Sequence, residues 1–318
     1  MILSYKVTPI CENTLSAAAS GLNNNGEVVG IANFSPNTLD GFYWHKGKTI
    51  KLSTLLGGDT SRAVGINNNG DITGYCTIKG NSHSFISQNG VLRDLGKLSN
   101  EPIANVEAKA INDMGQIVGF CHGLHMSAFL WQNDTMVALE DLSGAVHISE
   151  ANSCNNNGYV VGTSRSENPE VGHAVIWRNG KITYMMPEEW SYGKYINDNN
   201  QTLISGTHPN RGLLLENGKM TDIGSIFGNA QYVQPNSINN KGQMVGYCGY
   251  STLPGDSKAF VWDKKNGILE LNTLIHKNDP FHGQIKLTEA QAINDVGQIV
   301  AWQRLGNGQP SSYLLTPL

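Results

Sequence analysis

Three residues near position 121 are of the types that bind transition metals. Cys121, His122 and His125 have the spacing Cys-His-x-x-His, and zinc prefers thiolate and imidazole ligands. Successive side chains of a strand point to opposite sides, so Cys121 and His122 are expected to diverge. Cys121 also occupies the same place in its repeat as Cys76 and Cys248, which no histidine follows. We therefore predict no metal site here, and keep metal binding as the weaker interpretation.

A second group of titratable residues lies in the segment IHKNDPFHG. His276, Asp279 and His282 are close enough in sequence to share a surface patch, and an imidazole beside a carboxylate can transfer protons. Polar side chains are also the ordinary composition of a surface loop. We therefore predict that this segment contributes to a binding surface and contains no catalytic residue.

Aromatic residues outside the regular pattern of the chain indicate where a partner would bind. Trp190 lies in a connecting segment, Tyr192 lies two residues after it, and Tyr250 and Phe281 lie in or beside other connections. Tryptophan and tyrosine bury a large area at interfaces and keep a polar group for hydrogen bonding. Together with His276, Asp279 and His282, these four residues form the predicted partner-binding set, for a protein or a sugar.

Linear motifs of common enzyme classes are absent from the sequence. It contains no G-x-S-x-G, no H-E-x-x-H, no phosphate-binding loop and no dinucleotide fingerprint. We therefore predict no cofactor and no catalytic residue. An active site assembled from several repeats would leave no linear motif, so the sequence keeps that possibility open.

The element that must position these residues is a sequence repeat. The pattern Φ-N-[ND]-x-G-x-Φ-V-G, in which Φ is apolar, occurs about every 45 residues. Its first asparagines are Asn23, Asn67, Asn112, Asn155, Asn197, Asn239 and Asn294. The turn context predicts that they shape hairpins rather than form a ring of ligands. The fifth copy, INDNNQTLISG, has Asn200 in place of glycine and is interpreted as two residues longer.

Each repeat contains four short strand-like segments joined by tight turns, as in residues 62–95. Asn-Gly between alternating apolar runs, such as Asn89-Gly90, is a strong hairpin signal, because both residues tolerate a positive φ. A four-stranded sheet alone cannot bury its apolar positions, whereas seven sheets packed around an axis can. The first strands are rich in small residues, and the third strands carry pairs such as Phe42 and Trp44. The predicted fold is an all-β, seven-bladed β-propeller with four-stranded blades.

The ends of the chain predict how the ring closes. The last repeat stops after its third strand, SYLLTPL, and lacks the fourth strand with two apolar residues three apart, as in Leu52 and Leu55. Val7 and Ile10 have this spacing, so the N-terminal strand is expected to pair with the last blade and remove the open edge. Residues 1–318 are accordingly predicted to form one domain and a monomer.

Composition limits the partners and the compartment. The net charge of −4 and the absence of a basic cluster argue against nucleic acid, and no apolar run approaches the ~18 residues of a membrane span. Five cysteines cannot all pair within one chain, so free thiols are expected, which favours a reducing compartment. The N-terminus shows no export signal. The localisation therefore stays open between a mature exported protein, a protein secreted without a cleaved signal, and a cytoplasmic one.

The repeat motif, followed by strands such as SAFLW (127–131), HAVIW (173–177) and KAFVW (258–262), resembles the bacterial HAF-repeat proteins. The C-terminal run from ELNTLI to YLLTPL is especially similar to the closing blades of that group. The resemblance covers essentially the whole chain. It implies a propeller, often secreted or at the bacterial surface, and it implies no catalytic residue.

The predicted function is a non-catalytic scaffold that binds a protein through the face carrying the variable loops, as a bacterial secreted protein or effector. The variable segments are residues 32–40, 123–126, 165–172, 249–257 and 276–288. Two alternatives remain open at this stage. One is a lectin-like propeller that binds glycans, and the other is a hydrolase or lyase with its site at the mouth of the axial channel.

Overall fold

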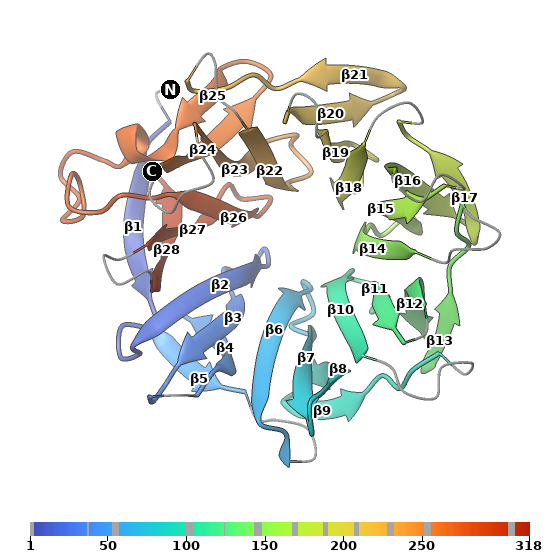
Figure 1. Cartoon of the computed structure of the whole chain (residues 1–318). Helices are drawn as coiled ribbons and strands as arrows, with labels where there is room; N and C mark the ends of the chain where they lie inside the picture. Colours follow the sequence, from blue (N-terminus) through green and yellow to red (C-terminus); the bar gives the residue numbers. More distant parts are fainter. Residues whose placement is uncertain are drawn as a thin grey trace.

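The computed structural model arranges the chain as a ring of seven antiparallel sheets around a central axis (Figure 1). It describes residues 3–36, 38–52, 57–98, 105–123, 125–142, 148–166, 171–186, 190–206, 210–227, 232–250, 256–304 and 309–318. Each sheet has four strands, and the first strand of each blade lies nearest the axis (Figure 1). The predicted seven-bladed propeller is therefore confirmed.

The strands follow one another in chain order within each blade. Blade 1 contains β2 (Ser16–Leu22), β3 (Val28–Asn33), β4 (Asp40–His45) and β5 (Lys48–Lys51). Blades 2 and 3 contain β6 (Thr60–Ile66), β7 (Ile72–Ile78), β8 (Asn81–Gln88), β9 (Val91–Asp94), β10 (Asn105–Ile111), β11 (Ile117–His122), β12 (Met126–Gln132) and β13 (Thr135–Ala138). Blades 4 and 5 contain β14 (Ser149–Cys154), β15 (Tyr159–Arg165), β16 (Gly172–Arg178), β17 (Lys181–Tyr184), β18 (Ser191–Ile196), β19 (Thr202–Gly206), β20 (Gly212–Glu216) and β21 (Lys219–Asp222). Blade 6 contains β22 (Tyr232–Ile238), β23 (Met244–Gly249), β24 (Ser257–Asp263) and β25 (Gly267–Glu270), followed by the 3-10 helix η2 (Leu271–Leu274). Blade 7 contains β26 (Glu289–Ile293), β27 (Ile299–Arg304), β28 (Pro310–Pro317) and β1 (Tyr5–Ile10).

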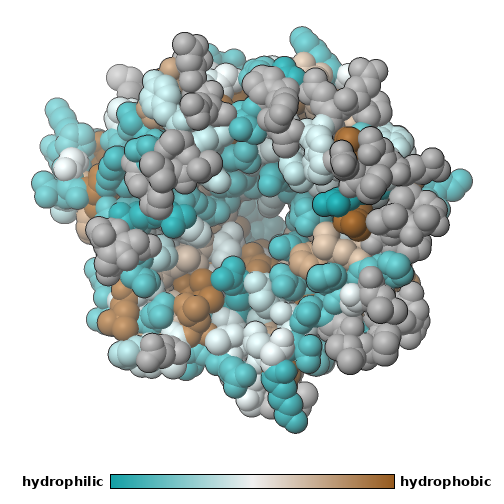
Figure 2. Space-filling view, viewed as in Figure 1, coloured by the Kyte–Doolittle hydropathy of each residue, from teal (hydrophilic) through white to brown (hydrophobic). Residues whose placement is uncertain are grey.

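Antiparallel pairing gives the ring two different faces. The turn face carries the Asn-containing turns between first and second strands and the turns between third and fourth strands. The variable-loop face carries the loops between second and third strands and the connections between blades. Figure 2 looks onto the variable-loop face, which is hollowed at the axis and surrounded there mostly by hydrophilic residues.

Small residues allow the first and second strands of a blade to pack closely. In blade 1 a Cβ on Gly30 would lie 2.7 Å from the Cα of Ala19, its partner across the pair. Blade 5 reverses this arrangement, because Ile204 takes the place of the second-strand glycine and faces Gly193 on the first strand. The register also shows that Ile204 and Gly162 are equivalent, and each lies seven positions after the first asparagine of its repeat, Asn197 or Asn155. The expectation of a longer fifth copy is therefore wrong.

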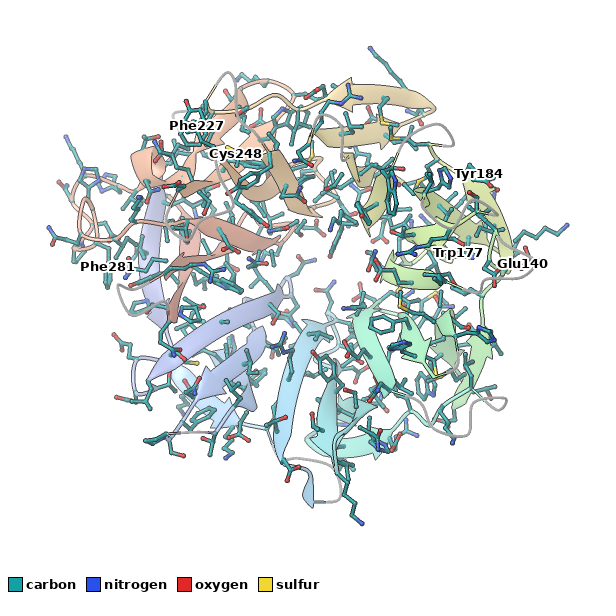
Figure 3. All side chains as sticks on the ribbon, in the orientation of Figure 1. Glu140, Trp177, Tyr184, Phe227, Cys248 and Phe281 are labelled. Carbon is teal, nitrogen blue, oxygen red and sulfur yellow. The ribbon has the colours of Figure 1, made fainter. Side chains whose placement is uncertain are left out.

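Aromatic side chains of the third strands fill the spaces between blades, as the aromatic-x-Trp pattern predicts. Phe42 and Trp44 of β4 are buried in a cluster with Val300 of β27 and Leu314 of β28. Trp177 of β16 is 1% exposed, and its indole Nε1 donates to the carbonyl oxygen of Glu140, 2.7 Å away in the preceding connection. In Figure 3 Glu140 lies at the outer edge of the ring, and Trp177 lies next to it on the inner side, within blade 4.

The N-terminal strand closes the ring. The sheet order is β1-β28-β27-β26, and β1 pairs along its whole length with β28, from Tyr5 opposite Pro317 to Ile10 opposite Ser312. The closure is thus confirmed, but its register differs from the sequence comparison. Tyr313 of β28 is the equivalent of Phe42 of β4. Pro9 pairs with Tyr313 as Lys51 pairs with Phe42, and Ile10 and Leu52 are the next residues. Ile10, and not Val7, is therefore the counterpart of Leu52.

The repeated asparagines link every blade to the next. In blade 3 the Oδ1 of Asn112 accepts bonds from the backbone N–H groups of Met114 (3.1 Å) and Gln116 (2.9 Å), which confirms the predicted turn role. The Nδ2 of the same residue donates to the carbonyl oxygen of Asn155 in blade 4, at 2.9 Å. All seven first asparagines are buried and repeat this inter-blade bond at 2.8 to 3.0 Å, from Asn23 around to Asn294, which donates back to Asn23.

The residue after each of these asparagines forms a second closed ring of hydrogen bonds. Its backbone N–H donates to the side-chain Oδ1 of the equivalent residue in the next blade, at 2.7 to 2.9 Å. Only asparagine or aspartate supplies an oxygen at this reach, which accounts for the [ND] position of the motif. The members are Asn24, Asn68, Asp113, Asn156, Asp198, Asn240 and Asp295. The turns therefore lock neighbouring blades together as well as reversing the chain.

Removing the closing strand is expected to destabilise the whole ring. Deletion of residues 1–10 exposes the edge of β28 and takes Tyr5, Val7 and Ile10 out of the core. We expect the melting temperature to fall by at least about 10 °C, or the protein to aggregate. Lys6→Ala, which changes an exposed side chain of β1, is the matched control and should melt like the parent. An unchanged melting temperature after the deletion would contradict the closure of the ring by β1. That residues 1–318 form one domain stays a prediction, and a single cooperative unfolding transition of the parent would support it.

Substitution of one ring asparagine removes the amide donor and keeps the oxygen that shapes the turn. Asn112→Asp retains the oxygen that accepts from the turn backbone, but replaces the Nδ2 group, which donates to the carbonyl oxygen of Asn155 and to the side chain of Gln116, with an oxygen. We expect a loss of about 1–3 kcal/mol in the free energy of unfolding, measured by urea denaturation at pH 7. Met114→Ala, in the same turn but 69% exposed, is the control. Equal stability of Asn112→Asp and the parent would show that the inter-blade bond has no energetic role.

Candidate functional site

The axis of the ring contains two polar cavities with an apolar belt between them. The belt consists of the residues that directly precede the ring asparagines: Leu22, Ile66, Ile111, Cys154, Ile196, Ile238 and Ile293. The cavity on the turn side has a volume of about 120 Å³ and is lined by the two rings of Asn and Asp residues. The cavity on the variable-loop side has about 290 Å³ and is lined by the first strands.

The turn-side cavity contains three carboxylates, each of which accepts three hydrogen bonds from neighbouring blades. Asp113, Asp198 and Asp295 each accept a backbone N–H on Oδ1. Their Oδ2 atoms each accept two side-chain amide bonds from the flanking blades, at 2.9 to 3.2 Å. The amides of Asn156 and Asn240 bridge neighbouring carboxylates. This ring therefore stabilises its own negative charge and belongs to the architecture of the propeller.

The variable-side cavity has a different electrostatic character. Among the described residues that line it, Lys109 of β10 and Lys194 of β18 are the charged ones. Both occupy the third position before a ring asparagine, where the other blades carry Ser20, Val64, Asn152, Asn236 and Gln291. Burial lowers the pKa of Lys194, and the positive charge of Lys109 lowers it further, against the opposing effect of Glu150. The two lysines are therefore close enough to influence each other across blade 4.

Cations lie over aromatic rings around the mouth of this cavity. The guanidinium of Arg62 lies 5.9 Å from the centre of the Tyr75 ring, and the ammonium of Lys109 lies 5.0 Å from that of Phe120. Lys194 lies 5.6 Å from the ring of Tyr192. Such contacts stabilise each pair by about 0.5–2 kcal/mol and keep a planar apolar surface beside a positive charge. The mouth is thus lined by aromatic and cationic groups from blades 2, 3 and 5.

Trp190 extends this lining outward from the mouth. Its ring lies 6.4 Å from that of Tyr192, with the guanidinium of Arg165 at 5.9 Å on Trp190. Arg165, Trp190, Tyr192 and Lys194 therefore form a row of cation, ring, ring and cation that runs from the end of β15 into the axial cavity. The structure brings together the two aromatic residues that the sequence predicted here. We call these four residues the aromatic row.

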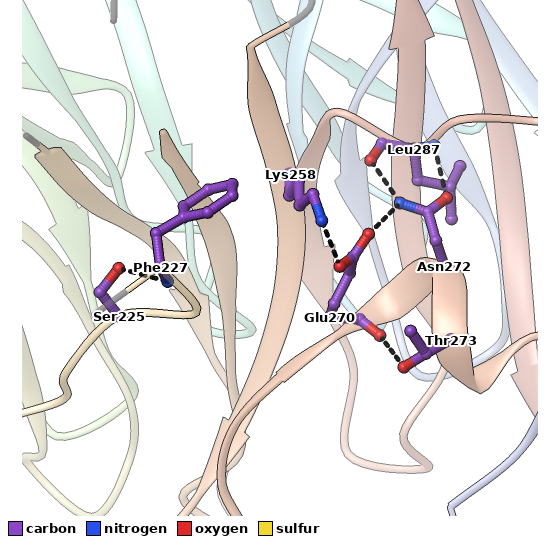
Figure 4. Close-up of polar contacts among 7 residues, drawn as sticks. All are labelled: Ser225, Phe227, Lys258, Glu270, Asn272, Thr273 and Leu287. Atoms are coloured by element: carbon purple, nitrogen blue, oxygen red, sulfur yellow. Dashed lines mark hydrogen bonds and ion pairs between the residues drawn. The ribbon is translucent and has the colours of Figure 1, made fainter. Parts of the chain in front are cut away.

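Tyr250 lies in a second cluster, between blades 5 and 6. Its ring is 50% exposed and lies 4.5 Å from that of Phe227, while Lys258 lies 5.2 Å from the same phenylalanine. Figure 4 shows Lys258 paired with Glu270, 2.7 Å away, and Glu270 in turn bonded to Asn272. The amide of Asn272 also exchanges bonds with the backbone of Leu287, so the ion pair rests on a fixed framework.

The segment 276–282, which we call the clasp, is hydrogen-bonded to the closing strand β1. Asp279 Oδ2 accepts the backbone N–H of Val7 at 2.9 Å, and the backbone N–H of His276 donates to the carbonyl oxygen of Tyr5 at 2.9 Å. The imidazole Nδ1 of His282 lies 2.9 Å from the carbonyl oxygen of Ile275. The ring of Phe281 packs edge-to-face on Tyr313, at the outer edge of the ring, away from Phe227 (Figure 3). These contacts give the segment a structural role.

The predicted set therefore lies at three separate places: Trp190 and Tyr192 in the aromatic row, Tyr250 beside Phe227, and the clasp. Sequence reasoning missed Arg165, Phe227 and the two channel lysines. Aligning the repeats would have shown Lys109 and Lys194 as long cationic residues at a position that is otherwise shorter and uncharged. Phe227 and Arg165 lie in connections that differ between blades, so the repeat carries no signal for them.

The trio near position 121 diverges as expected. Cys121 is buried in the core of blade 3, whereas His122 and His125 are exposed. In the described ranges, no three His, Cys, Asp or Glu side chains are grouped closely enough to hold a metal ion. The five cysteines are free, as predicted, and all five are buried.

Comparisons with known proteins agree with the fold. Residues 195–305 match the family model described as a protein of unknown function, DUF3466, whereas no curated protein matches the sequence. The β-propeller domain of the Trilobed protease from Pyrococcus furiosus is 12% identical with a TM-score of 0.62, and the match covers 95% of this chain and 94% of that one. A catalytically inactive virginiamycin B lyase from Staphylococcus aureus with quinupristin is 13% identical with a TM-score of 0.59, and the match covers 99% of each chain. YCF48 bound to D1 peptide is 8% identical with a TM-score of 0.57, and the match covers 98% of this chain and 94% of that one.

These similarities define the class of protein: a seven-bladed β-propeller whose structural relatives have varied functions. At such identities they establish the shared fold alone. In the part of the chain that the structure describes, no helix is long and apolar enough to cross a membrane.

The buried thiols are expected to be unreactive. Burial raises the pKa of Cys11 to about 11 and that of Cys154 to about 12, so at pH 8 only about 0.1% or less of either thiol is the reactive thiolate. A chromogenic thiol reagent should label none of the five cysteines of the folded protein within minutes at pH 8, and all five in denaturant. Labelling should accelerate as the pH rises. Fast modification of Cys11 or Cys154 at pH 8 would contradict the described burial.

Proposed function

We propose that this propeller is a non-catalytic scaffold that binds a protein partner through its variable-loop face. The observation that carries the proposal is the aromatic row, in which the rings of Trp190 and Tyr192 lie next to each other between Arg165 and Lys194 at the mouth of the axial cavity. Tryptophan, tyrosine and arginine are the residue types that contribute most binding energy at protein interfaces.

The surroundings of the aromatic row support this function. Tyr250 and Phe227 form a second aromatic cluster one blade further along the chain, beside the paired Lys258 and Glu270. A half-exposed tyrosine that already contacts another ring loses little conformational freedom when a partner covers it. Both clusters lie in connections beside the ends of strands of the closed ring, with Tyr192 in β18 and Lys258 in β24, and the ring provides the fixed framework that a preorganised binding surface requires.

Several finer assignments are proposals on the same basis. Residues 1–318 are proposed to act as one domain and as a monomer, possessing repeats of the HAF type. The bacterial and secreted or effector character rests on that resemblance alone. YCF48 bound to D1 peptide shares this fold, so the architecture is compatible with holding a peptide, although fold similarity alone does not assign a partner.

Affinity capture with face-specific variants tests the proposal. The immobilised parent chain is compared with Trp190→Ala and Tyr192→Ala by quantitative mass spectrometry. Tyr159→Ala is the matched control, because Tyr159 also stacks with an arginine, Arg178 at 4.8 Å, but lies beside the turn between β14 and β15 on the opposite face. A specific partner should be retained by the parent and the control and lost from both aromatic-row variants.

The captured protein is then purified and titrated against each variant. We expect the Kd to rise at least about tenfold for Trp190→Ala, as for the removal of an interface hot spot, and to stay unchanged for Tyr159→Ala. If all captured proteins bind the aromatic-row variants and the control equally, the partner does not use this surface and the proposal fails.

A further inference from the structure

We propose that the variable-side axial cavity is a binding site for a small oxyanion, a ligand bearing a carboxylate or phosphate group, held between Lys109 and Lys194. This inference goes beyond the partner-binding function and does not depend on it. It rests on the composition of the cavity, the position of the two ammonium groups and their lack of full charge compensation.

The cavity presents positive charge on an otherwise neutral wall. Its volume of about 290 Å³ suits a small organic anion, and its described lining combines two lysines with hydroxyl and amide residues and the apolar belt below. The lysines come from blades 3 and 5, so their side chains approach the axis from different directions. A ligand on the axis would be contacted from two sides, an arrangement that an extended surface cannot provide.

The cationic groups are incompletely paired. The ammonium of Lys109 is 4.0 Å from a carboxylate oxygen of Glu107, a distance too long for a hydrogen bond. Among the residues that the structure describes, Lys194 has no carboxylate within 4.0 Å, and its close contact is the ring face of Tyr192 at 5.6 Å. An oxyanion would supply the hydrogen-bond acceptors that both ammonium groups lack.

The amide side chains that line the cavity already donate hydrogen bonds within the protein. The side-chain Nδ2 groups of Asn152 and Asn236 already donate to the carbonyl oxygens of Gly193 and Ala290 in following blades, at 2.9 and 2.8 Å. Gln291 donates to Glu289 at 3.2 Å. The cavity wall is therefore held in place by its uncharged residues, while the two ammonium groups stay available to a ligand.

The surroundings of Lys194 disfavour its charged form. Burial lowers its pKa, and Lys109 acts in the same direction, because a second positive charge nearby disfavours protonation. Glu150 acts in the opposite direction from the rim of the cavity and does not cancel these effects. A bound oxyanion would favour the charged forms of both lysines and raise the pKa of Lys194.

The rim of the cavity carries charges of both signs. Glu107, Glu150 and Glu289 lie two residues before the cavity-lining positions of their strands, nearer to the variable-loop face, and Arg62 occupies the same level in β6. Glu289 is paired with Arg304 at 2.9 Å. A small oxyanion that binds the lysines would lie below this mixed rim.

Isothermal titration calorimetry tests the site in the intact chain, with inorganic phosphate and succinate as probes at low chloride. We expect one probe molecule per chain, with the Kd raised at least about tenfold in Lys109→Gln and Lys194→Gln. Lys219→Gln, which removes an exposed lysine of β21, should bind like the parent. Binding of phosphate alone assigns a phosphate group as the ligand class, and binding of succinate alone assigns a carboxylate.

Lys194→Arg keeps the charge and controls for folding, because it should bind the same probe while the glutamine variant does not. A second measurement uses lysine acetylation followed by mass spectrometry, in which the bound probe should protect Lys109 and Lys194 but not Lys219. No heat of binding for either probe up to about 10 mM, or equal affinity of the parent and both glutamine variants, would overturn the proposal. Neither readout requires a protein partner, so failure here leaves the partner-binding proposal to its own test.

Discussion

The ring depends on one bond repeated seven times, in which a buried asparagine amide of one blade donates to the backbone of the next. The same side chain also accepts two backbone N–H groups of its own turn, so each asparagine couples the shape of a hairpin to the position of a neighbouring sheet. Because the seventh asparagine donates to the first, the blades have one consistent spacing around the axis. Aspartate or alanine at this position would lose the donor, which explains why all seven copies carry asparagine.

This constraint shapes the axial channel. Bringing seven first strands together requires small residues where they meet the second strands, as at Ala19 and Gly30, and blade 5 satisfies the same limit by exchanging the large and small positions at Gly193 and Ile204. The ends of the channel acquire opposite electrostatic character. On the turn side lie carboxylates that each accept three hydrogen bonds from neighbouring blades, whereas two incompletely paired lysines lie on the variable-loop side. Only the second arrangement leaves charge available to a ligand.

The closing strand and the clasp solve the other problem of a ring, its open edge. Pairing β1 with β28 gives the seventh blade its outer strand, and Asp279 and His276 hold β1 from the opposite side. A segment whose composition resembles an acid–base site thus has a structural role. The residues that vary between blades, chiefly the aromatic row and the cluster around Phe227, lie outside this repeated framework, and the proposed recognition surface is built from them.

The sequence by itself determined the seven repeats, the four strands of each, the turn role of the asparagines and the identity of the closing strand, because these depend on local periodicity and on residues such as Asn89 and Gly90 whose backbone preferences act over a few positions. It also indicated that Trp190 and Tyr192 differ from the repeated pattern. Only the tertiary structure decided that Ile10 is the counterpart of Leu52, that Asn112 bonds to the next blade, and that Lys109 and Lys194 share one cavity. Each of these relations involves residues that are about 40 or more positions apart in the sequence. Whether such residues meet in space depends on how the sheets pack around the axis, and no local sequence pattern contains that information.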